Sequence, residues 1–176
     1  MDLTEKTLAT REIYSGRVIK VRVDTVSLPD GNQSFREVVE HAGAVAVVAL
    51  DDENNIVLVR QYRKPLDRVL IEIPAGTMEK DEDPLLCAQR ELEEETGYLA
   101  AHWQRILSYY SAPGFTDEHL HIYLATGLSQ GKTNPDPDEF MELVHIPLPE
   151  AYGLIFSGQI ADGKSIIGIQ YVMGNR

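Results

Sequence analysis

The feature that most constrains this sequence is a glutamate-rich stretch at residues 76–98, GTMEKDEDPLLCAQRELEEETGY. Its glycine, glutamate, arginine and bulky apolar residues follow one spacing: Gly76, Glu82, Arg90, Glu91, Leu92, Glu94, Glu95, Gly97 and, in the last bulky place, Tyr98. At average residue frequencies, these identities would coincide at a random starting point about once in a billion trials. The pattern therefore indicates a specific structure and a specific chemistry.

The stretch has the start and stop signals of a helix. An aspartate side chain caps free backbone amides and proline suits the first helical position, so Asp83 and Pro84 predict the helix start. Gly97 is a typical helix end. At about 100° per residue, the apolar side chains between these limits share one stripe: Leu85, Ala88 and Leu92. We therefore expect a helix that packs this stripe on a core.

Three glutamates of this helix, Glu91, Glu94 and Glu95, are expected on an adjoining face. At spacings of three and four residues, their carboxylates repel one another unless a cation lies among them. Carboxylate oxygens suit Mg²⁺ and Mn²⁺, and such ions assist the attack of water on a phosphoanhydride. We expect Arg90 to pair with a glutamate as a strut rather than to bind substrate. The alternative, a solvated acidic helix face, does not explain the spacing.

The length and composition bound the class of protein. A chain of 176 residues, 43% of them hydrophobic, suits one domain with a real core and a small appendage. It has no charged-then-apolar leader and no apolar run of about 18 residues, so we expect neither secretion nor membrane insertion. The one cysteine, Cys87, has no partner for an internal disulfide. A reducing, cytoplasmic setting is therefore the default.

The charge narrows the range of partners. A formal net charge of -12 argues against nucleic acid or an anionic membrane. Residues 76–98 contain eight acidic and two basic residues and so carry half of that charge. A phosphate substrate would be repelled there unless metal ions came with it.

The rest of the sequence alternates strand-like segments with turns. Residues 1–10 are expected to be a loose start, and residues 11–40 a hairpin or small antiparallel sheet. The apolar run at residues 43–50 predicts a strand buried on both faces. His119 and His121 alternate along one strand, and we expect strand decoration rather than a metal pair. Further strands are predicted at residues 56–63, 103–110, 119–126 and 141–148, and helices at residues 149–158 and 162–173, the second capped by Asp162.

The stretch at residues 76–98 resembles the signature of the Nudix hydrolases. Its flanks, residues 61–76 and 110–125, are similar to the branch that acts on ADP-ribose and related nucleoside diphosphate sugars, in which a proline occupies the place of Pro113. The resemblance implies an α/β Nudix fold in residues 42–176, an α/β/α sandwich with a mixed sheet. Residues 1–41 would form a small antiparallel sheet that crosses to the partner in a homodimer.

The resemblance also implies a metal site and a catalytic set. The ligands of two or three Mg²⁺ or Mn²⁺ ions would be Glu91, Glu94, Glu95 and the main-chain carbonyl of Ala75. Glu82 would stabilise these ligands without binding the metal ions itself. Glu94 and Arg90 count with the catalytic residues, Arg90 as the strut that holds the glutamates.

Substrate contacts are implied outside the helix. Arg63 would grip phosphate and Arg36 would reach the substrate from the partner subunit, because the planar arginine fork binds phosphate oxygens in pairs. Glu118 would contact the distal sugar, and Pro113 marks the substrate branch. For each arginine, the alternative is an ordinary ion pair at the end of a strand.

The general base in this branch comes from an acidic loop, which is NPDPDEF at residues 134–140 in this chain. The loop offers Asp136, Asp138 and Glu139. We expect Glu139, because it has the longest reach and lies where the loop rejoins a strand, and Asp138 stays open as an alternative. A loop suits a base that closes over substrate and expels water. Without the family, a solvated turn rich in aspartate would be the simpler interpretation.

One departure from the family pattern bears on which nucleobase the site prefers. Relatives that favour adenine stack it on an aromatic residue of the amino-terminal strands, and the corresponding place falls at Arg17 or Val18. Tyr14 is near but offset. Arginine stacks on a base with less preference for adenine. We therefore expect a range of nucleoside diphosphate sugars rather than ADP-ribose alone.

The implied reaction is metal-dependent hydrolysis of the pyrophosphate in a nucleoside diphosphate sugar. ADP-ribose would give AMP and ribose 5-phosphate, with the loop carboxylate taking the proton from the attacking water. Two alternatives stay open: a Nudix hydrolase of nucleoside triphosphates or dinucleoside polyphosphates, and a non-catalytic module that binds a nucleotide sugar. Pro113 and the amino-terminal sheet argue against the first, and the complete set of glutamates argues against the second.

Overall fold

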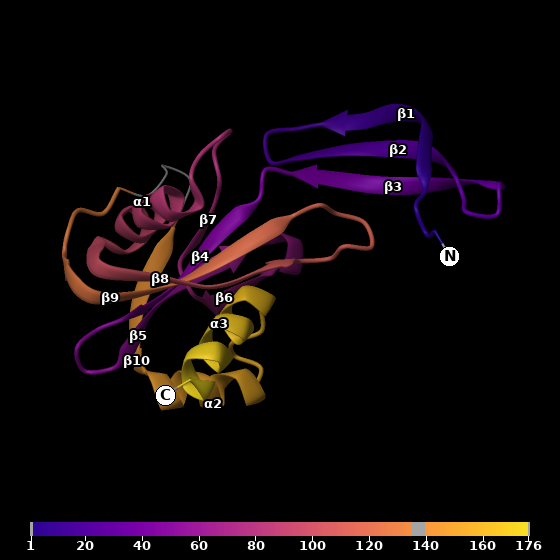
Figure 1. Ribbon diagram of the computed structural model, residues 1–176. Coiled ribbons are helices and arrows are strands. Elements are labelled where there is room, and N and C mark those ends of the chain that lie inside the picture. Colours follow the sequence, from indigo (N-terminus) through magenta and orange to yellow (C-terminus); the bar gives the residue numbers. More distant parts are fainter. Residues whose placement is uncertain (1, 135–139, 176) are drawn as a thin grey trace. The chain divides into compact units, whose positions relative to one another are not determined.

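The structure is a computed structural model that describes residues 2–134 and 140–175 (Figure 1). The chain divides into two compact units. The first comprises Met1–Gly43 with Tyr110–His119, and the second comprises Ala44–Tyr109 with Leu120–Arg176. The sequence-based division into residues 1–41 and 42–176 stays a prediction.

The first unit is built on an antiparallel sheet in the order β1-β2-β3. Its strands are β1 (Lys6–Ser15), β2 (Ile19–Ser27) and β3 (Gln33–His41). The expected loose start at residues 1–10 is therefore wrong from Lys6 onward. All ten residues of β1 are exposed, and its sequence shows no apolar alternation. The strand conformation of β1 is held instead by pairing with β2, from Lys6↔Ser27 to Ser15↔Lys20.

Residues 110–119 belong to the same unit because they bond to its third strand. Val39 forms a parallel bridge with Thr116, and its amide donates to the carbonyl of Phe115 over 2.8 Å. The amide of His41 donates to Oδ1 of Asp117 over 2.9 Å. The loop that carries Pro113 is thus attached to β3.

The second unit contains a mixed sheet with the path β10-β5-β4-β9-β8, to which β6 adds on β5 and β7 on β4. Strands β4 and β9 run parallel, whereas β5 pairs with β4, β6 and β10 in antiparallel fashion. The strands are β4 (Ala44–Leu50), β5 (Asn55–Arg63), β6 (Arg68–Glu72), β7 (Ala75–Thr77), β8 (Tyr98–Tyr110), β9 (His119–Gln130) and β10 (Met141–Pro147). The strand expected at residues 103–110 begins earlier, at Tyr98, because its neighbour β9 continues the hydrogen-bonded ladder.

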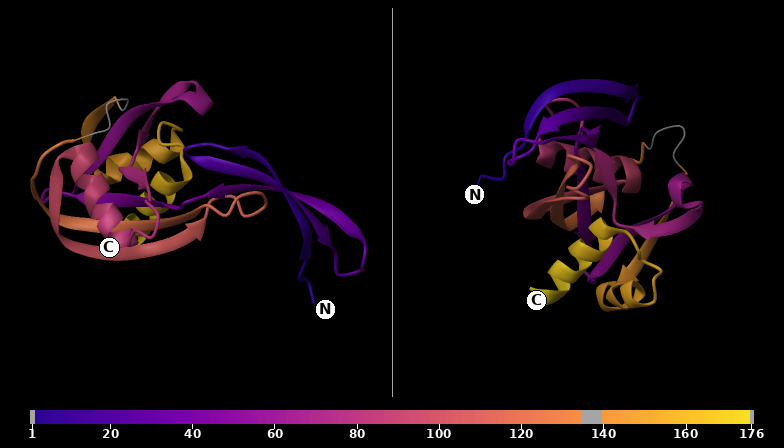
Figure 2. Two further views of the ribbon diagram at one scale, coloured as in Figure 1. Left: turned by 90° about the horizontal axis from the view of Figure 1, so that it is seen from above. Right: turned by 90° about the vertical axis from the view of Figure 1, so that its right-hand side faces the viewer.

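Helices cover both faces of this sheet. The uniformly buried strand β4 sends Val45, Val47 and Ala49 into one apolar cluster and Ala46, Val48 and Leu50 into another. The first cluster includes residues of α1 (Pro84–Thr96), and the second includes residues of α2 (Leu148–Phe156) and α3 (Gly163–Gly174). Figures 1 and 2 show α2 and α3 together on the face opposite α1. The predicted α/β/α sandwich with a mixed sheet is confirmed.

Close packing explains one glycine of α3. A Cβ at Gly168 would lie 2.7 Å from Cγ2 of Val48, so the helix approaches β4 more closely than any side chain would permit. The start of α3 is capped as predicted, since Asp162 Oδ1 accepts from the amide of Ser165 over 3.1 Å. Within the described residues, no helix is both long enough and apolar enough to span a membrane.

Candidate functional site

Helix α1 has the limits that its sequence predicts. The Asp83 side chain accepts from the amides of Leu85 and Leu86 over 2.9 and 3.2 Å, with Pro84 in the first turn. Gly97 adopts φ 72° and its amide donates to the carbonyl of Glu93 over 2.7 Å. A left-handed residue of this kind ends a helix, and glycine adopts it without steric cost.

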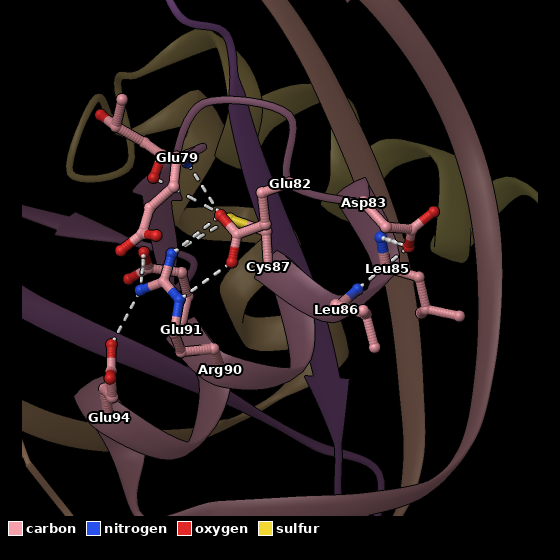
Figure 3. A network of polar contacts seen from close by, with 10 residues as sticks. Glu79, Glu82, Asp83, Leu85, Leu86, Cys87, Arg90, Glu91 and Glu94 are labelled. Carbon is pink, nitrogen blue, oxygen red and sulfur yellow. Dashed lines mark hydrogen bonds and ion pairs between the residues drawn. The ribbon is translucent and has the colours of Figure 1, made fainter.

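Arg90 lies at the centre of the acidic face of α1. Its Nε donates to Glu82 Oε1 over 3.1 Å, and its Nη1 donates to Glu91 Oε1 over 2.7 Å and to Glu94 Oε2 over 2.9 Å. Figure 3 shows the three carboxylates converging on this guanidinium. In this structure, the cation that lies among the glutamates is thus Arg90, the residue expected to pair with them.

The ion pairs shift two pKa values in the network. Hydrogen bonds from Arg90 are the main reason that the pKa of Glu82 falls to about 2, against the weaker opposing effect of burial. The same hydrogen bonds raise the pKa of Arg90. Glu82 therefore stays ionised across the neutral range and keeps Arg90 in place.

Two further contacts connect α1 to β7, the strand just before it. The carboxylate of Glu91 lies against Gly76, where an added Cβ would come within 1.9 Å of its Cδ. Glu95 Oε2 accepts from the amide of Ala75 over 3.0 Å, and Glu95 is largely buried. Glu95 therefore points toward the backbone of β7 rather than outward with Glu94.

The donor set suits a hard divalent cation by type. Every predicted side-chain ligand is a carboxylate, and oxygen donors are those that Mg²⁺ and Mn²⁺ prefer. Among residues 2–134 and 140–175, however, no three or more His, Cys, Asp or Glu side chains converge closely enough to hold a metal ion. Direct coordination by Glu91 or Glu94 would require their carboxylates to turn from Arg90 toward the ion.

Arg63, the predicted phosphate ligand, is held by a buried carboxylate. Its Nε and Nη2 donate to Glu72 Oε1 and Oε2, each over 2.8 Å. Glu72 also pairs with Lys164 at the start of α3. Neither Glu72 nor Lys164 was predicted from the sequence, although a glutamate inside the apolar segment RVLIEI signals the need for a buried cation.

A recess of about 680 Å³ opens beside Glu95. Tyr62, Val69 and Leu143 form part of its apolar wall. Arg60 and Glu142, which pair over 2.7 Å across β5 and β10, also line it. A volume of this size falls in the range of about 300–1,000 Å³ that is usual for small-molecule sites.

The other predicted substrate residues lie in the first unit. Arg36 bonds to Glu5 in bidentate fashion, Nε to Oε2 over 2.9 Å, so its guanidinium has an ion-pair partner just before β1. Pro113 lies in the segment between β8 and β9. Glu118 Oε1 lies 3.8 Å from Nδ1 of His41.

Aromatic contacts bear on two sequence expectations. The Tyr14 ring packs against Gly16, where a Cβ would meet the Tyr14 hydroxyl at 2.5 Å, so an aromatic ring lies beside the residue that precedes Arg17. His119 stacks on Tyr110 with ring centroids 4.6 Å apart, and His121 Nδ1 lies 2.8 Å from Oγ of Ser108. Both histidines therefore have partners on the neighbouring strand β8.

The predicted general base falls outside the described residues. Glu139 and its alternatives Asp136 and Asp138 belong to residues 135–139, so their roles stay predictions. The residues just before them are attached to α1: the amide of Asn134 donates to the carbonyl of Glu94 over 3.1 Å, and that of Gly131 to the carbonyl of Gly97 over 2.6 Å. The acidic segment therefore begins next to the end of the helix that carries the glutamates.

Comparison with known proteins agrees with this arrangement. Residues 40–166 match the NUDIX domain family. The chain belongs to the Nudix family. Residues 5–39 match the nucleoside diphosphate sugar hydrolase N-terminal domain. This second match covers most of the antiparallel sheet of the first unit.

Individual relatives cover nearly the whole chain. An ADP-ribose pyrophosphatase of Bacillus subtilis (strain 168) is 48% identical over 97% of this chain and 93% of its own length. A methanol dehydrogenase activator of Bacillus methanolicus is 50% identical over 96% of this chain and 92% of its own length. A crystal structure of an ADP compounds hydrolase superposes with a TM-score of 0.88 at 20% identity, covering 99% of this chain and 95% of that one, which confirms the fold.

Proposed function

We propose that this Nudix protein hydrolyses the pyrophosphate bond of nucleoside diphosphate sugars, ADP-ribose among them. The products would be a nucleoside monophosphate and a sugar phosphate. The observation that carries the proposal is the match of residues 5–39 to the amino-terminal domain of nucleoside diphosphate sugar hydrolases, next to a complete Nudix helix. The 48% identical ADP-ribose pyrophosphatase supports ADP-ribose as the first substrate to assay.

The predicted ligands give each residue a role. Glu91, Glu94, Glu95 and the carbonyl of Ala75 would hold two or three Mg²⁺ or Mn²⁺ ions. When bound, such ions supply charge neutralisation at the phosphates and a more acidic water. Arg63 would orient the diphosphate, and Arg36 would add a second contact from the partner subunit. Glu139 would accept the proton of the attacking water, with Asp138 as the alternative.

A homodimer belongs to the same proposal. The sheet of the first unit exposes the apolar side chains of Leu8, Ile13 and Phe35, which a partner subunit would cover in the dimer. Arg36 would then serve the site of the partner, and Glu118 would contact the distal sugar. A cytoplasmic setting is proposed from the single thiol of Cys87, which has no partner for an internal disulfide.

The test is a product assay with Mg²⁺ or Mn²⁺ on ADP-ribose, ADP-glucose, UDP-glucose, GDP-mannose and a deoxynucleoside triphosphate. Chromatography should resolve a monophosphate and a sugar phosphate from each cleaved nucleotide sugar. Preferential cleavage of the triphosphate would favour the alternative Nudix activity. If the wild type released no phosphate ester while Glu95→Gln still bound ADP-ribose, the binding module would replace the enzyme. Glu150→Gln, the same change on exposed α2, is the control.

A second candidate function comes from the 50% identical relative. Its name assigns it an effect on a methanol dehydrogenase, so this chain is a candidate activator of a dehydrogenase. The assay adds the protein to a purified methanol dehydrogenase and compares wild type with Glu95→Gln. Activation lost in the variant would make the effect a consequence of hydrolysis, and activation retained would make it a separate binding function.

A further inference from the structure

Arg63 is oriented by two parallel hydrogen bonds to one buried carboxylate. Its Nε and Nη2 each lie 2.8 Å from an oxygen of Glu72 on the neighbouring strand β6. The Glu72 side chain is 2% exposed, whereas that of Arg63 is 38% exposed. Bidentate pairing fixes the plane of a guanidinium as well as its position. The buried edge of Arg63 is therefore anchored, and its other edge faces away from Glu72.

Helix α3 holds the other side of Glu72. Lys164 Nζ donates to Glu72 Oε2 and, over 2.9 Å, to Asp162 Oδ1. Oγ of Ser165 accepts from the amide of Ile73 over 2.9 Å. Two successive residues of α3 thus attach to two successive residues at the end of β6, so the position of Glu72 depends on the helix.

The remaining donors of Arg63 point to its function. An arginine carries five N–H donors, of which Glu72 engages two. No hydrogen bond to a residue in the described part of the chain uses Nη1 of Arg63. Glu72 lies three residues before Ala75, whose amide donates to Glu95 Oε2 over 3.0 Å, so the segment that holds Arg63 leads directly to a glutamate of the Nudix helix. A diphosphate bound near Glu95 would therefore meet donors that already have the right orientation.

We propose that Glu72 and Lys164 are positioning residues of the site: Glu72 sets the plane of the Arg63 guanidinium that faces the substrate diphosphate, and Lys164 keeps Glu72 in place from α3. The inference rests on the proposed function, because it assigns Arg63 to the diphosphate. Lys164 itself is not a phosphate ligand. Its side chain is 14% exposed and its ammonium already serves two carboxylates.

A double-mutant cycle tests whether Glu72 acts through Arg63. Arg63→Ala should raise KM for ADP-ribose about tenfold or more, the usual effect of losing charge-assisted hydrogen bonds. Glu72→Gln should raise KM about tenfold with kcat within about threefold, because the amide can accept at one atom instead of two. In the Arg63→Ala background, Glu72→Gln should raise KM no further. Additive effects would overturn the inference, since a purely structural role does not depend on Arg63.

Lys164 gives a second cycle that stays informative if Glu72→Gln does not fold. Lys164→Gln should raise KM in the wild type and not in Arg63→Ala, and Lys164→Arg should restore part of the loss. Lys64→Gln and Glu150→Gln make the same chemical changes at exposed positions and should leave KM unchanged. An equal effect of Lys164→Gln in both backgrounds would overturn its positioning role.

Binding measurements separate this inference from the proposed function. The same cycles are measured by calorimetry with the non-hydrolysable α,β-methylene analogue of ADP-ribose and Mg²⁺. If the wild type binds the analogue but cleaves no nucleotide sugar, the proposed function fails and the cycles still decide the roles of Glu72 and Lys164. Binding that does not weaken in Arg63→Ala would overturn the inference alone.

Discussion

The carboxylate of Glu91 lies against the α-carbon of Gly76. A Cβ at residue 76 would be 1.9 Å from Cδ of Glu91 and 2.1 and 2.2 Å from its two oxygens. The glycine that opens the Nudix signature is therefore needed for the space that it leaves rather than for an unusual φ. Helix α1 and β7 approach each other closely enough for a glutamate to rest on the backbone.

Gly76→Ala should displace Glu91 and impair the site. Because contacts below 3 Å cannot persist, the Glu91 carboxylate must move away from the place that the signature reserves for it. We expect kcat/KM for ADP-ribose to fall about a hundredfold. The control is Gly153→Ala in α2, where a Cβ meets nothing within 4 Å and alanine favours the helix. Unchanged kinetics in Gly76→Ala would show that the position of Glu91 does not matter for turnover.

Arg90→Gln should disperse the glutamates of α1. The pKa of Glu82 should rise from about 2 toward its ordinary value of 4.5, because the hydrogen bonds from Arg90 are the main cause of its depression. Activity should fall about tenfold or more, since repelling carboxylates lose their common orientation. Carbon-13 NMR titration of the glutamate carboxyls measures the first effect. Arg105→Gln on exposed β8 is the control, and a Glu82 pKa that stays near 2 would contradict the prediction.

Glu72→Gln should change how stability depends on pH. Burial tends to raise the pKa of Glu72, but hydrogen bonds from Arg63 and the charge of Lys164 outweigh it and lower the pKa below 4.5. A carboxylate whose pKa is lower in the folded state contributes stability that is fully present above pH 4.5. This stability is lost as the pH falls toward the folded-state pKa. Wild type should exceed the variant by about 2 kcal/mol at pH 7, allowing for the partly exposed Arg63.

Urea unfolding at a series of pH values measures this difference. The gap between wild type and Glu72→Gln should be constant above about pH 5.5 and should narrow below 4.5, since protonated glutamate and glutamine are alike in charge. Glu150→Gln should show no such gap. A gap that widens as the pH falls would contradict the sign of the shift.

Cys87 should resist alkylation in the folded protein. Its side chain is fully buried, and burial, with a hydrogen bond to Glu82, raises the pKa of its thiol to about 12. Since the thiolate is the nucleophile, almost none is present at neutral pH. Iodoacetamide at pH 8 should leave the native protein unmodified by mass spectrometry and modify it fully in urea. Rapid modification of the native protein would mean that α1 opens readily.

Glu139→Gln should reduce the turnover number by about a hundredfold or more while changing KM little, because a general base acts in the chemical step. Steady-state kinetics on ADP-ribose provide the measurement. Asp136→Asn and Asp138→Asn make the matching change at the two alternative bases of the same loop. If Glu139→Gln turned over normally and Asp138→Asn did not, the role would pass to Asp138.

Local signals determined the elements around the site. Asp83, Pro84 and Gly97 set the limits of α1 through capping and left-handed geometry, which depend on a few neighbouring residues. The apolar run at residues 43–50 became β4 with both faces buried. The start of β1, residues 6–10, was missed because these residues show no apolar alternation. Their order depends on pairing with β2, which the sequence of β1 does not describe.

The sequence by itself determined the family, the helix with its glutamates and the layered α/β fold, because these depend on local spacing and on apolar periodicity. The tertiary structure decided which charges meet. Glu72 joins Arg63 and Lys164, which are distant in sequence, because β5, β6 and the start of α3 converge on one buried point. Gly76 accommodates Glu91 for the same reason: closeness between separate elements depends on packing, and spacing along the chain does not encode it.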